Sequence, residues 1–283
     1  MPSLRTLLVL GRTSNLPTVW SNCLAAWWLG GGGNSERLPL LLGGSTLLYV
    51  GGMFLNDAFD AGFDAQHRRE RPIPSGAISS RAVWQFSALL LLAGLACLFL
   101  INNTTGLWGV ALAGAIVLYD ALHKLITFSP ILMAACRFLL YLLAASTATL
   151  GITGWAVWCA LALAAYIVGL SYLARKESTG LEVRYWPCIF LALPVLLAWL
   201  MNVEEFREKA LLLAAVLGLW VMRCLRFTYR PIERNIGKSV AGLLAGIVWV
   251  DLLAVADVPK EFAAVFIGLF ALALFFQRFV PAT

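Results

Sequence analysis

Charged residues are scarce in this 283-residue sequence. Only 13% of its residues are Asp, Glu, Lys or Arg, whereas 61% are hydrophobic and the mean hydropathy is +0.83. Soluble proteins carry about 25% charged residues, and a chain with half that share cannot cover a water-exposed surface. The composition therefore excludes a soluble enzyme, a disordered chain and a small secreted scaffold, and it predicts an integral membrane protein.

Cysteine and histidine are also few and scattered. The six cysteines form no CxxC pair, and no histidine lies near one at the spacing of a metal site. Each cysteine lies in or beside an apolar segment, which is typical of a small core side chain. The sequence therefore offers no centre of soft metal ligands, and we interpret His67 and His123 as ordinary polar loop residues.

Long apolar segments dominate the sequence instead. Ten of them approach the length that crosses about 30 Å of hydrocarbon, and a lipid-facing backbone must satisfy its own hydrogen bonds, which predicts helices. Because only residues 257–261 separate the last two segments, we predict one all-α domain over residues 1–283 with nine or ten transmembrane helices. The segments are 16–30, 39–55, 82–101, 107–122, 130–150, 155–173, 185–201, 209–226, 239–256 and 261–280.

The distribution of positive charge predicts the orientation in the membrane. If the N-terminus is cytoplasmic, most of the 21 lysines and arginines lie in cytoplasmic loops. This asymmetry agrees with the positive-inside rule, so we expect a multi-pass protein of an inner or plasma membrane. Basic residues then indicate contact with membrane lipid and not with nucleic acid. The basic residues on the opposite side are Arg37, Arg207, Lys209 and Lys260.

The longest predicted cytoplasmic loop begins with a run of acidic residues. Residues 56–64 read NDAFDAGFD, and residues 68–76 read RRERPIPSG. If the preceding helix continues into this stretch, Asp57, Asp60 and Asp64 lie on one side of it. Three carboxylates on one stripe repel each other unless cations neutralise them. Hard oxygen ligands of this kind are typical of Mg²⁺, which also binds substrate phosphates.

The residues after the acidic run add donors for an anion. Arg68 and Arg71 precede a stiff Pro-Ile-Pro-Ser-Gly turn. A carboxylate cage followed by arginines suits a diphosphate bridged to the protein by Mg²⁺. The alternative is a solvated acidic helix end whose charge these arginines balance. We favour the diphosphate site, because ionisable groups at the end of a membrane span are costly and tend to be functional.

These residues resemble a known family. The motif N-D-x-x-D-x-x-x-D followed by R-x-x-R-P-I-P-S-G is similar to the first aspartate-rich motif of the UbiA superfamily of intramembrane prenyltransferases. Residues 12–22 are similar to the first helix of that family, and residues 119–124 to its tyrosine–lysine element. Residues 133–137 and 172–177 resemble the EboC-like branch. The resemblance covers most of the chain.

The resemblance implies a fold and a reaction. In this family two acidic motifs cap a helical bundle on its cytoplasmic side, where they bind Mg²⁺ and a polyprenyl diphosphate. The bundle surrounds a central cavity that opens to the cytoplasm and laterally to lipid, which takes up the isoprenoid tail. The implied reaction transfers the prenyl group to a lipophilic acceptor, most commonly an aromatic one, within the membrane.

The second acidic motif departs from the family pattern. Members of the family typically show D-x-x-x-D, whereas residues 175–182 read RKESTGLE. Glu177 and Glu182 are five residues apart and do not share one helical face unless Gly180 interrupts the helix. The number of metal ions and the acceptor chemistry therefore stay open.

The implied reaction assigns a role to each charged residue. Its barrier comes mainly from negative charge on the departing diphosphate, which Mg²⁺ and fixed Arg or Lys donors stabilise. The expected catalytic metal ligands are Asp57, Asp60, Asp64 and Glu177. The residues expected to bind the substrate around them are Asn56, Arg68, Arg71, Lys124, Arg175 and Glu182.

Two residues near Lys124 each have two interpretations. The ring of Tyr119 either shields the allylic cation through its negatively charged face or belongs to an interfacial aromatic belt. Asp120 is either a general base or ligand, or simply the helical partner of Lys124 four residues further on. We favour the pairing for Asp120.

Polar residues within the predicted spans complete the set of candidates. Asn15 and Asn22 lie on one helical face and either line the substrate pocket or form interhelical hydrogen bonds. Arg137 is costly to leave unpaired, so we expect it to meet an acidic residue or the diphosphate. Asp251 has no evident partner in the sequence. We therefore leave its role open.

Three classes of function agree with these features. We favour a Mg²⁺-dependent prenyltransferase. A transporter or lipid-handling protein would explain the many spans, but the sequence shows no paired broken helices in its two halves. A diphosphate-binding member of the same fold without catalysis would explain the altered second motif. Turnover distinguishes the prenyltransferase from the non-catalytic diphosphate-binding protein. Diphosphate binding distinguishes both of these from the transporter or lipid-handling protein.

Overall fold

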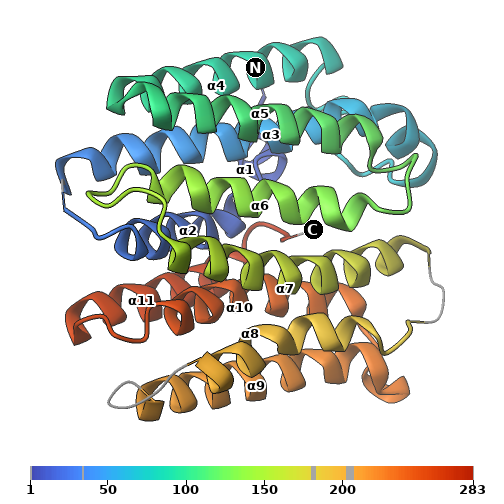
Figure 1. The fold of residues 1–283 in the computed structure, drawn as a ribbon. Helices are drawn as coiled ribbons and strands as arrows, with labels where there is room; N and C mark the ends of the chain where they lie inside the picture. The colour runs from blue at the N-terminus through green and yellow to red at the C-terminus, as the bar shows by residue number, and fades with distance from the viewer. Residues whose placement is uncertain (1, 34, 180–182, 202–206, 283) are drawn as a thin grey trace.

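The computed structural model describes residues 2–33, 35–179, 183–201 and 207–282. Within these ranges the chain forms helices and turns without a strand, which confirms the predicted all-α class (Figure 1). The α-helices are α1 Leu4–Leu10, α2 Leu16–Leu29, α3 Leu38–His67, α4 Ser80–Ile101, α5 Asn103–Leu122, α6 Ser129–Ala145, α7 Gly154–Thr179, α8 Pro187–Met201, α9 Arg207–Tyr229, α10 Ile236–Ala254 and α11 Lys260–Phe276.

The predicted spans coincide with helices. Each apolar segment corresponds to one helix in the series α2 to α11. In the described part of the chain, six helices are long and apolar enough to cross a membrane, namely α3, α4, α5, α7, α9 and α10, and α6 and α8 are apolar but shorter. The protein is therefore a multi-pass membrane protein, and the total of nine or ten crossings stays a prediction.

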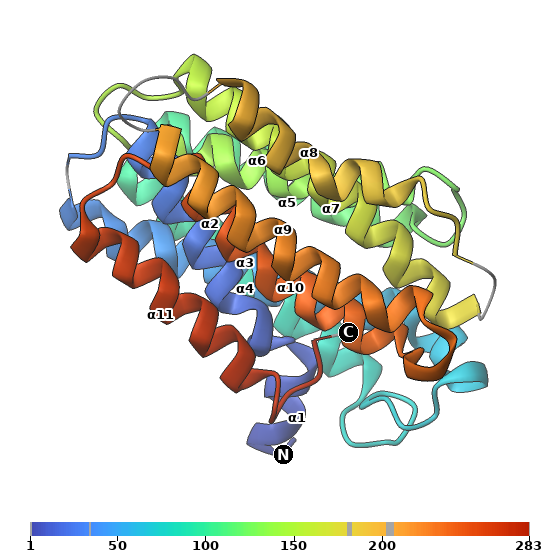
Figure 2. The ribbon, with the colours of Figure 1, turned by 90° about the horizontal axis from the view of Figure 1, so that it is seen from below.

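The long helices pack side by side in a bundle (Figures 1 and 2). α3 packs against α4, α6 against α7 and α9 against α10, while α2 contacts α6, α10 and α11. Glycine permits a close crossing of α3 and α4, because a methyl group on Gly94 would lie 2.9 Å from the Gly44 carbonyl oxygen. Such close approach of backbones is a main source of packing energy between membrane helices.

Apolar side chains also cover the outside of the bundle. Leu89 and Leu92 on α4 and Leu107 on α5 are 62%, 66% and 65% exposed, whereas Leu48 and Leu98 between α3 and α4 are fully buried. Large exposed leucines on successive turns would be costly in water. Their position indicates that these faces of α4 and α5 contact lipid.

α3 continues well beyond the predicted span. Its 30 residues extend about 45 Å, which exceeds the roughly 30 Å of a bilayer's hydrocarbon. The acidic run of residues 56–64 therefore lies on the last turns of this helix, as the stripe of carboxylates requires. The helix ends at His67, and the backbone leaves the helical region at Arg68, where the loop begins.

The chain turns sharply between α1 and α2. Arg12 has a φ of 41°, in the left-handed region that residues with a Cβ atom rarely adopt. The short 3-10 helix η1, Thr13–Asn15, follows, and Pro17 lies in the first turn of α2, where its missing N–H breaks no hydrogen bond. This turn brings the side chain of Arg12 to the acidic end of α3.

Candidate active site

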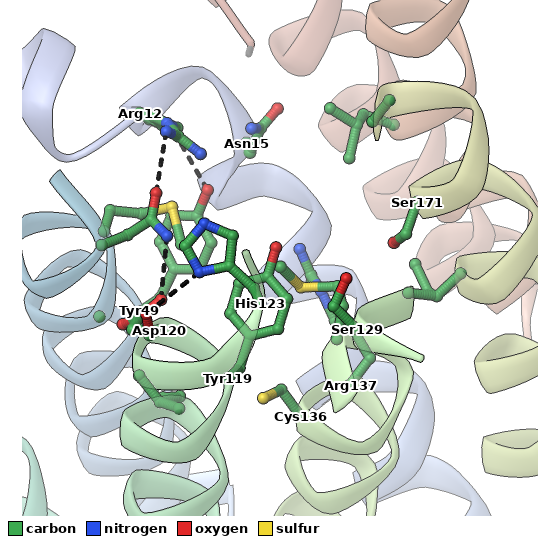
Figure 3. Close-up of a pocket in the computed structure, with 18 of the residues that line it drawn as sticks. Arg12, Asn15, Tyr49, Tyr119, Asp120, His123, Ser129, Cys136, Arg137 and Ser171 are labelled. Carbon is green, nitrogen blue, oxygen red and sulfur yellow. Dashed lines mark hydrogen bonds between the residues drawn. The ribbon is translucent and has the colours of Figure 1, made fainter. Parts of the chain in front are cut away.

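A cavity of about 600 Å³ lies where α2, α3, α5, α6, α7 and α10 meet. Along α3 its wall extends from Phe63 to Ser45, which corresponds to about 27 Å of helix. Arg12 reaches it from the turn before α2, and Tyr119 and His123 reach it from the C-terminal end of α5 (Figure 3). One end of the cavity is thus rich in charge, and the wall further along the helices is mostly apolar.

The structure brings most of the predicted site residues to this cavity. Asp57, Asp64 and Asn22 are buried beside it, with 4%, 3% and 0% exposure. The side chain of Glu177 and residues 180–182, which include Glu182, lie outside the described residues. The predicted residues that line the cavity are Asn15, Asn56, Asp60, Arg68, Arg71, Tyr119, Asp120, Lys124, Arg137 and Arg175.

Asp60 joins the end of α3 to the end of α5. Its Oδ1 atom lies 2.6 Å from Nζ of Lys124 and 3.3 Å from Nε2 of His123. Both partners follow the last residue of α5, so their side chains can reach across to α3. His123 also stacks on the ring of Tyr119, with ring centroids 5.1 Å apart. Our interpretation of His123 as an ordinary loop residue was therefore wrong, because it lies against an acidic side chain in the cavity.

Arg12 is the cation nearest to the deeper part of the acidic stripe. Its Nη2 atom donates to Asn56 Oδ1 at 3.2 Å and lies 3.4 Å from Asp57 Oδ1. Burial lowers the pKa of Arg12, but the charges of Asp57 and its neighbours together outweigh burial and raise it. Its Nε atom is buried without a partner among the described residues. Arg12 is thus a permanent cation, and among the described residues its Nε–H group has no acceptor.

Asp120 has a different partner from the one we favoured. Nδ2 of Asn56 donates to Asp120 Oδ1 at 3.1 Å, whereas Lys124 pairs with Asp60. α5 ends at Leu122, so Lys124 lies outside the helix and does not follow the helical spacing that the pairing assumed. Asn56 therefore links Arg12 and Asp120 across the polar end of the cavity.

The donor chemistry of this end fits a divalent cation. Asp64 Oδ1 and Asp120 Oδ2 are buried and lack a hydrogen-bond partner among the described residues. Orphaned carboxylate oxygens close to a polar cavity are suitable ligands for a hard cation such as Mg²⁺. In the same described ranges, no three His, Cys, Asp or Glu side chains form a metal-binding group. The magnesium ligands therefore stay a prediction.

The predicted anion donors differ in how far they are already engaged. Arg71 Nη1 lies 3.9 Å from Asp57 Oδ1, and burial together with the nearby charge of Arg12 lowers the pKa of Arg71. Nη1 of Arg175 donates to the carbonyl oxygen of Thr127 at 2.9 Å and to Ser129 Oγ at 3.0 Å. Arg175 thus ties α7 to the loop before α6, while Arg71 balances the acidic stripe.

The intramembrane polar residues form a second cluster. Nη1 of Arg137 donates to Asn22 Oδ1 at 2.7 Å, and Asn22 Nδ2 donates to Asp251 Oδ2 at 2.7 Å. Asn15 Nδ2 donates to the carbonyl oxygen of Ala282 at 2.9 Å while also lining the cavity. Asn22 therefore forms interhelical hydrogen bonds, one of its two interpretations, and Asp251 has partners that the sequence did not reveal.

The geometry defines a class of protein. A multi-pass bundle holds a partly apolar cavity with paired carboxylates and cations at one end. The sequence pattern of the UbiA prenyltransferase family matches residues 14–179, which is more than half of the chain. The chain therefore belongs to the UbiA prenyltransferase family.

Curated relatives carry the names of several prenyl-transferring enzymes. Digeranylgeranylglyceryl phosphate synthase of Methanothrix thermoacetophila is 34% identical over 121 residues, which cover 42% of this chain and 45% of that protein. Protoheme IX farnesyltransferase of Macrococcus caseolyticus is 31% identical over 116 residues, or 39% and 38% of the two chains. The chain thus spans less than half the length of these curated relatives.

Solved structures share the fold over nearly the whole chain. A UbiA homolog from Archaeoglobus fulgidus bound to GPP and Mg²⁺ superposes with a TM-score of 0.68 at 16% identity, covering 94% of this chain and 99% of that one. The apo structure of a UbiA homolog from Aeropyrum pernix K1 gives 0.68 at 14% identity, with 88% and 98% covered. At these identities the likeness shows the shared fold alone.

Proposed function

We propose that this protein catalyses the Mg²⁺-dependent transfer of a prenyl group from a polyprenyl diphosphate to a lipophilic acceptor within the membrane. The observation that carries the proposal is the convergence of Arg12, Asp60 and Lys124 at one end of a cavity with mostly apolar walls beyond. A donor with an anionic head and a hydrocarbon tail matches this division of polarity. The names of the curated relatives and the GPP and Mg²⁺ bound to a structural neighbour support it.

The acidic end of α3 would hold the metal. Asp60 and Asp64 are the proposed Mg²⁺ ligands, with Asp57 beside them and Glu177 of α7 as the ligand of a second ion. When bound, Mg²⁺ would supply positive charge against the negative charge that grows on the diphosphate as its bond to carbon breaks. Asp64 Oδ1, which is buried and has no hydrogen-bond partner within the described ranges, supports this assignment.

The cations of the chain would bind the diphosphate directly. Lys124 carries three N–H donors, lies 2.6 Å from Asp60 Oδ1 and lies 3.9 Å from the centre of the Phe63 ring. Its ammonium group can therefore also donate to phosphate oxygens in the cavity. Nε of Arg12 has no hydrogen-bond partner among the residues that the structure describes, and Arg68 and Arg71 line the same end of the cavity. Because the surrounding protein already holds these donors in place, they would stabilise the leaving group with little reorganisation.

Residues in the walls of the cavity would assist the transfer of the prenyl group to the acceptor and the loss of a proton. The allylic C–O bond breaks with its electron pair on the diphosphate, the acceptor nucleophile forms the new bond to carbon, and the acceptor then loses a proton. The face of Tyr119 would stabilise the electron-poor allylic carbon. Asp120 Oδ2, which has no hydrogen-bond partner in the described part of the chain, is the proposed proton acceptor. Ile116 and Met133 would exclude water from the reacting carbon.

We propose that the acidic end of the cavity faces the cytoplasm. Arg68, Arg71 and Lys124 lie in loops at this end, and Arg175 lies near the C-terminal end of α7 on the same side of the bundle. Such an excess of basic loop residues is the signal of the cytoplasmic side. A soluble diphosphate head would then enter from the cytoplasm, while the prenyl tail stays among the helices or in lipid.

Replacing Asp60 with asparagine is expected to abolish Mg²⁺-dependent binding of the donor. In detergent, geranylgeranyl diphosphate with Mg²⁺ should raise the midpoint of thermal unfolding of the wild type by about 5 °C, because a ligand that binds only the folded state stabilises it. Asp60→Asn removes the negative charge that pairs with Lys124 and that would bind the metal, so the shift should disappear. The measurement is thermal unfolding with and without Mg²⁺.

An acidic residue far from the cavity provides the matched control. Asp257 lies exposed between α10 and α11, and Asp257→Asn should keep the full shift. Geranylgeraniol, which lacks the diphosphate, should give no Mg²⁺-dependent shift with any variant. If prenyl diphosphates of several chain lengths cause no shift in the thermal unfolding of the wild type, the transporter class would be favoured. If the protein binds the donor but mass spectrometry detects no prenylated product, a non-catalytic member of the fold would be favoured.

Lys124→Ala is expected to weaken donor binding about tenfold even when Mg²⁺ is saturating, because Lys124 contacts phosphate in its own right. The dissociation constant for geranylgeranyl diphosphate, measured at rising Mg²⁺, checks this. Lys260→Ala, at the start of α11, is the control and should bind like the wild type. Should excess Mg²⁺ restore full affinity to Lys124→Ala, the lysine would act by organising the metal site instead.

A further inference from the structure

Residues 277–282 follow α11 and turn back toward the bundle (Figure 2). We call these residues the return segment. Its side chains alternate, because Val280 and Ala282 are 6% and 7% exposed, whereas Phe279 and Pro281 are exposed. A period of two is typical of backbone that buries one face. Ala282 also lines the cavity of the proposed active site, so the return segment contributes to its wall.

Two hydrogen bonds join the return segment to η1. Ser14 Oγ donates to the carbonyl oxygen of Pro281 at 3.3 Å, and Asn15 Nδ2 donates to the carbonyl oxygen of Ala282 at 2.9 Å. Ser14 and Asn15 are 0% and 4% exposed, so these bonds are shielded from competing water. At its other end, Gln277 Nε2 donates to a backbone carbonyl of α10 at 3.0 Å. The return segment is thus fixed to α10 and to η1.

The same 3-10 helix holds the left-handed turn at Arg12. The backbone N–H of Asn15 donates to the carbonyl oxygen of Arg12 at 3.0 Å, and Tyr49 Oη donates to the same oxygen at 3.5 Å. The φ of 41° at Arg12 is costly and persists only where the surroundings fix it. η1 has only three residues, and so short a helix is not stable by itself. The bonds to the return segment are therefore outside contacts that favour this conformation.

The turn decides where the Arg12 guanidinium lies. Its Nη2 atom reaches across to α3, where it lies 3.2 Å from Asn56 Oδ1 and 3.4 Å from Asp57 Oδ1. The side chains of Arg12 and Asn15 both line the cavity (Figure 3). Because hydrogen bonds weaken steeply with distance and angle, a small shift of the backbone at Arg12 would separate these partners. Whatever holds the turn therefore also holds a cation of the donor site.

We propose that the return segment positions Arg12 for the diphosphate by holding η1 and the left-handed turn before it. The proposal rests on the proposed function, in which Arg12 is a donor to the diphosphate. Asn15 is then a positioning residue, because it contacts the return segment through its side chain and Arg12 through its backbone. The return segment lies outside residues 14–179, which match the family pattern.

Hydrogen exchange in detergent without ligand tests the link from the return segment to the turn. Peptides that span Asn15 should exchange at least about fivefold faster when residues 280–283 are deleted, because the turn opens more often. Asn15→Ala removes one of the two bonds and should act in the same direction. Phe279→Ala, at an outward side chain of the same segment, should exchange like the wild type. Unchanged exchange in both the deletion and Asn15→Ala would overturn the proposal. Equal acceleration in peptides of α4 would mean general destabilisation and would also overturn it.

Donor affinity tests the link from the turn to the site. Calorimetry with Mg²⁺ and geranyl thiolodiphosphate, an unreactive donor analogue, should give a dissociation constant about tenfold higher for the deletion than for the wild type. In an Arg12→Ala background the same deletion should raise it less than about twofold, because the residue that it positions is gone. Phe279→Ala should bind like the wild type.

A deletion that weakens binding equally with and without Arg12 would overturn the proposal, since the return segment would then act on another part of the site. Failure of the analogue to bind the wild type would count against the proposed function instead. In that case the exchange data would still decide whether the return segment holds the turn at Arg12.

Discussion

Arg12→Ala is expected to slow prenyl transfer about 100-fold and to lower the free energy of unfolding by about 2 kcal/mol. Arg12 is the cation that touches both Asn56 and Asp57, at 3.2 and 3.4 Å, and its buried Nε has no partner among the described residues. Its loss removes a proposed donor to the diphosphate. Within the described ranges it leaves the buried Asp57 with Arg71, at 3.9 Å, as its remaining ion-pair partner.

Rate and stability are measured separately in this test. Product formation is followed with saturating Mg²⁺ and donor, and unfolding is followed in mixed micelles without ligand. Arg5→Ala, at an exposed arginine of α1, should change neither quantity. Arg12→Lys should recover most of the stability but little of the rate, because a point charge does not replace a planar fork of donors. A fully active Arg12→Ala enzyme would remove Arg12 from the donor site.

The helices could be predicted from the sequence because each depends on local information. An apolar run of bilayer length has few alternatives to a helix when lipid offers the backbone no hydrogen bonds. The acidic run was equally readable, since the spacing of Asp57, Asp60 and Asp64 required a helix and α3 supplies one to His67. The family resemblance rested on these same residues, and the family match confirms it.

The pairing of polar side chains could not be predicted in the same way. Lys124 follows Asp120 by a helical interval, but α5 ends before it and its partner is Asp60, 64 residues earlier. Apart from its position next to Lys124, nothing in the sequence indicated that His123 contacts the acidic run. Arg12 was visible as a basic residue near the N-terminus and as the first residue of the stretch that is similar to the family's first helix. Its contacts depend on a left-handed turn that local propensity does not favour. These contacts depend on how α1, α3 and α5 are arranged in space.

Asp251 shows the same limit inside the membrane. The sequence placed a lone carboxylate in a span without a partner, and the structure supplies Ser21 and Asn22 from α2, more than 200 residues away. An ionisable group at such a depth is costly unless neighbouring groups bind it. Its cost is offset by a network that joins α10 to α2 and, through Asn22, to Arg137 on α6.

Asp251→Ala is therefore expected to lower the free energy of unfolding by about 3 kcal/mol, among the larger effects of a single substitution. The change leaves the Ser21 hydroxyl and the Asn22 amide without their acceptor, and it removes the carboxylate nearest to Arg137 along the network. Equilibrium unfolding in mixed micelles measures the loss. Asp251→Asn keeps one acceptor oxygen of the same shape and should lose about 1 kcal/mol.

A double-mutant cycle separates the network from a local packing defect. If Asp251 acts through Asn22, the losses from Asp251→Ala and Asn22→Ala should fall short of additivity by at least about 1 kcal/mol in the double variant, because the second substitution finds its partner already gone. Asp257→Asn, in the exposed turn after α10, should be neutral. Additive losses would mean that α10 and α2 are joined by packing alone, and that Asp251 does not act on Arg137 through Asn22.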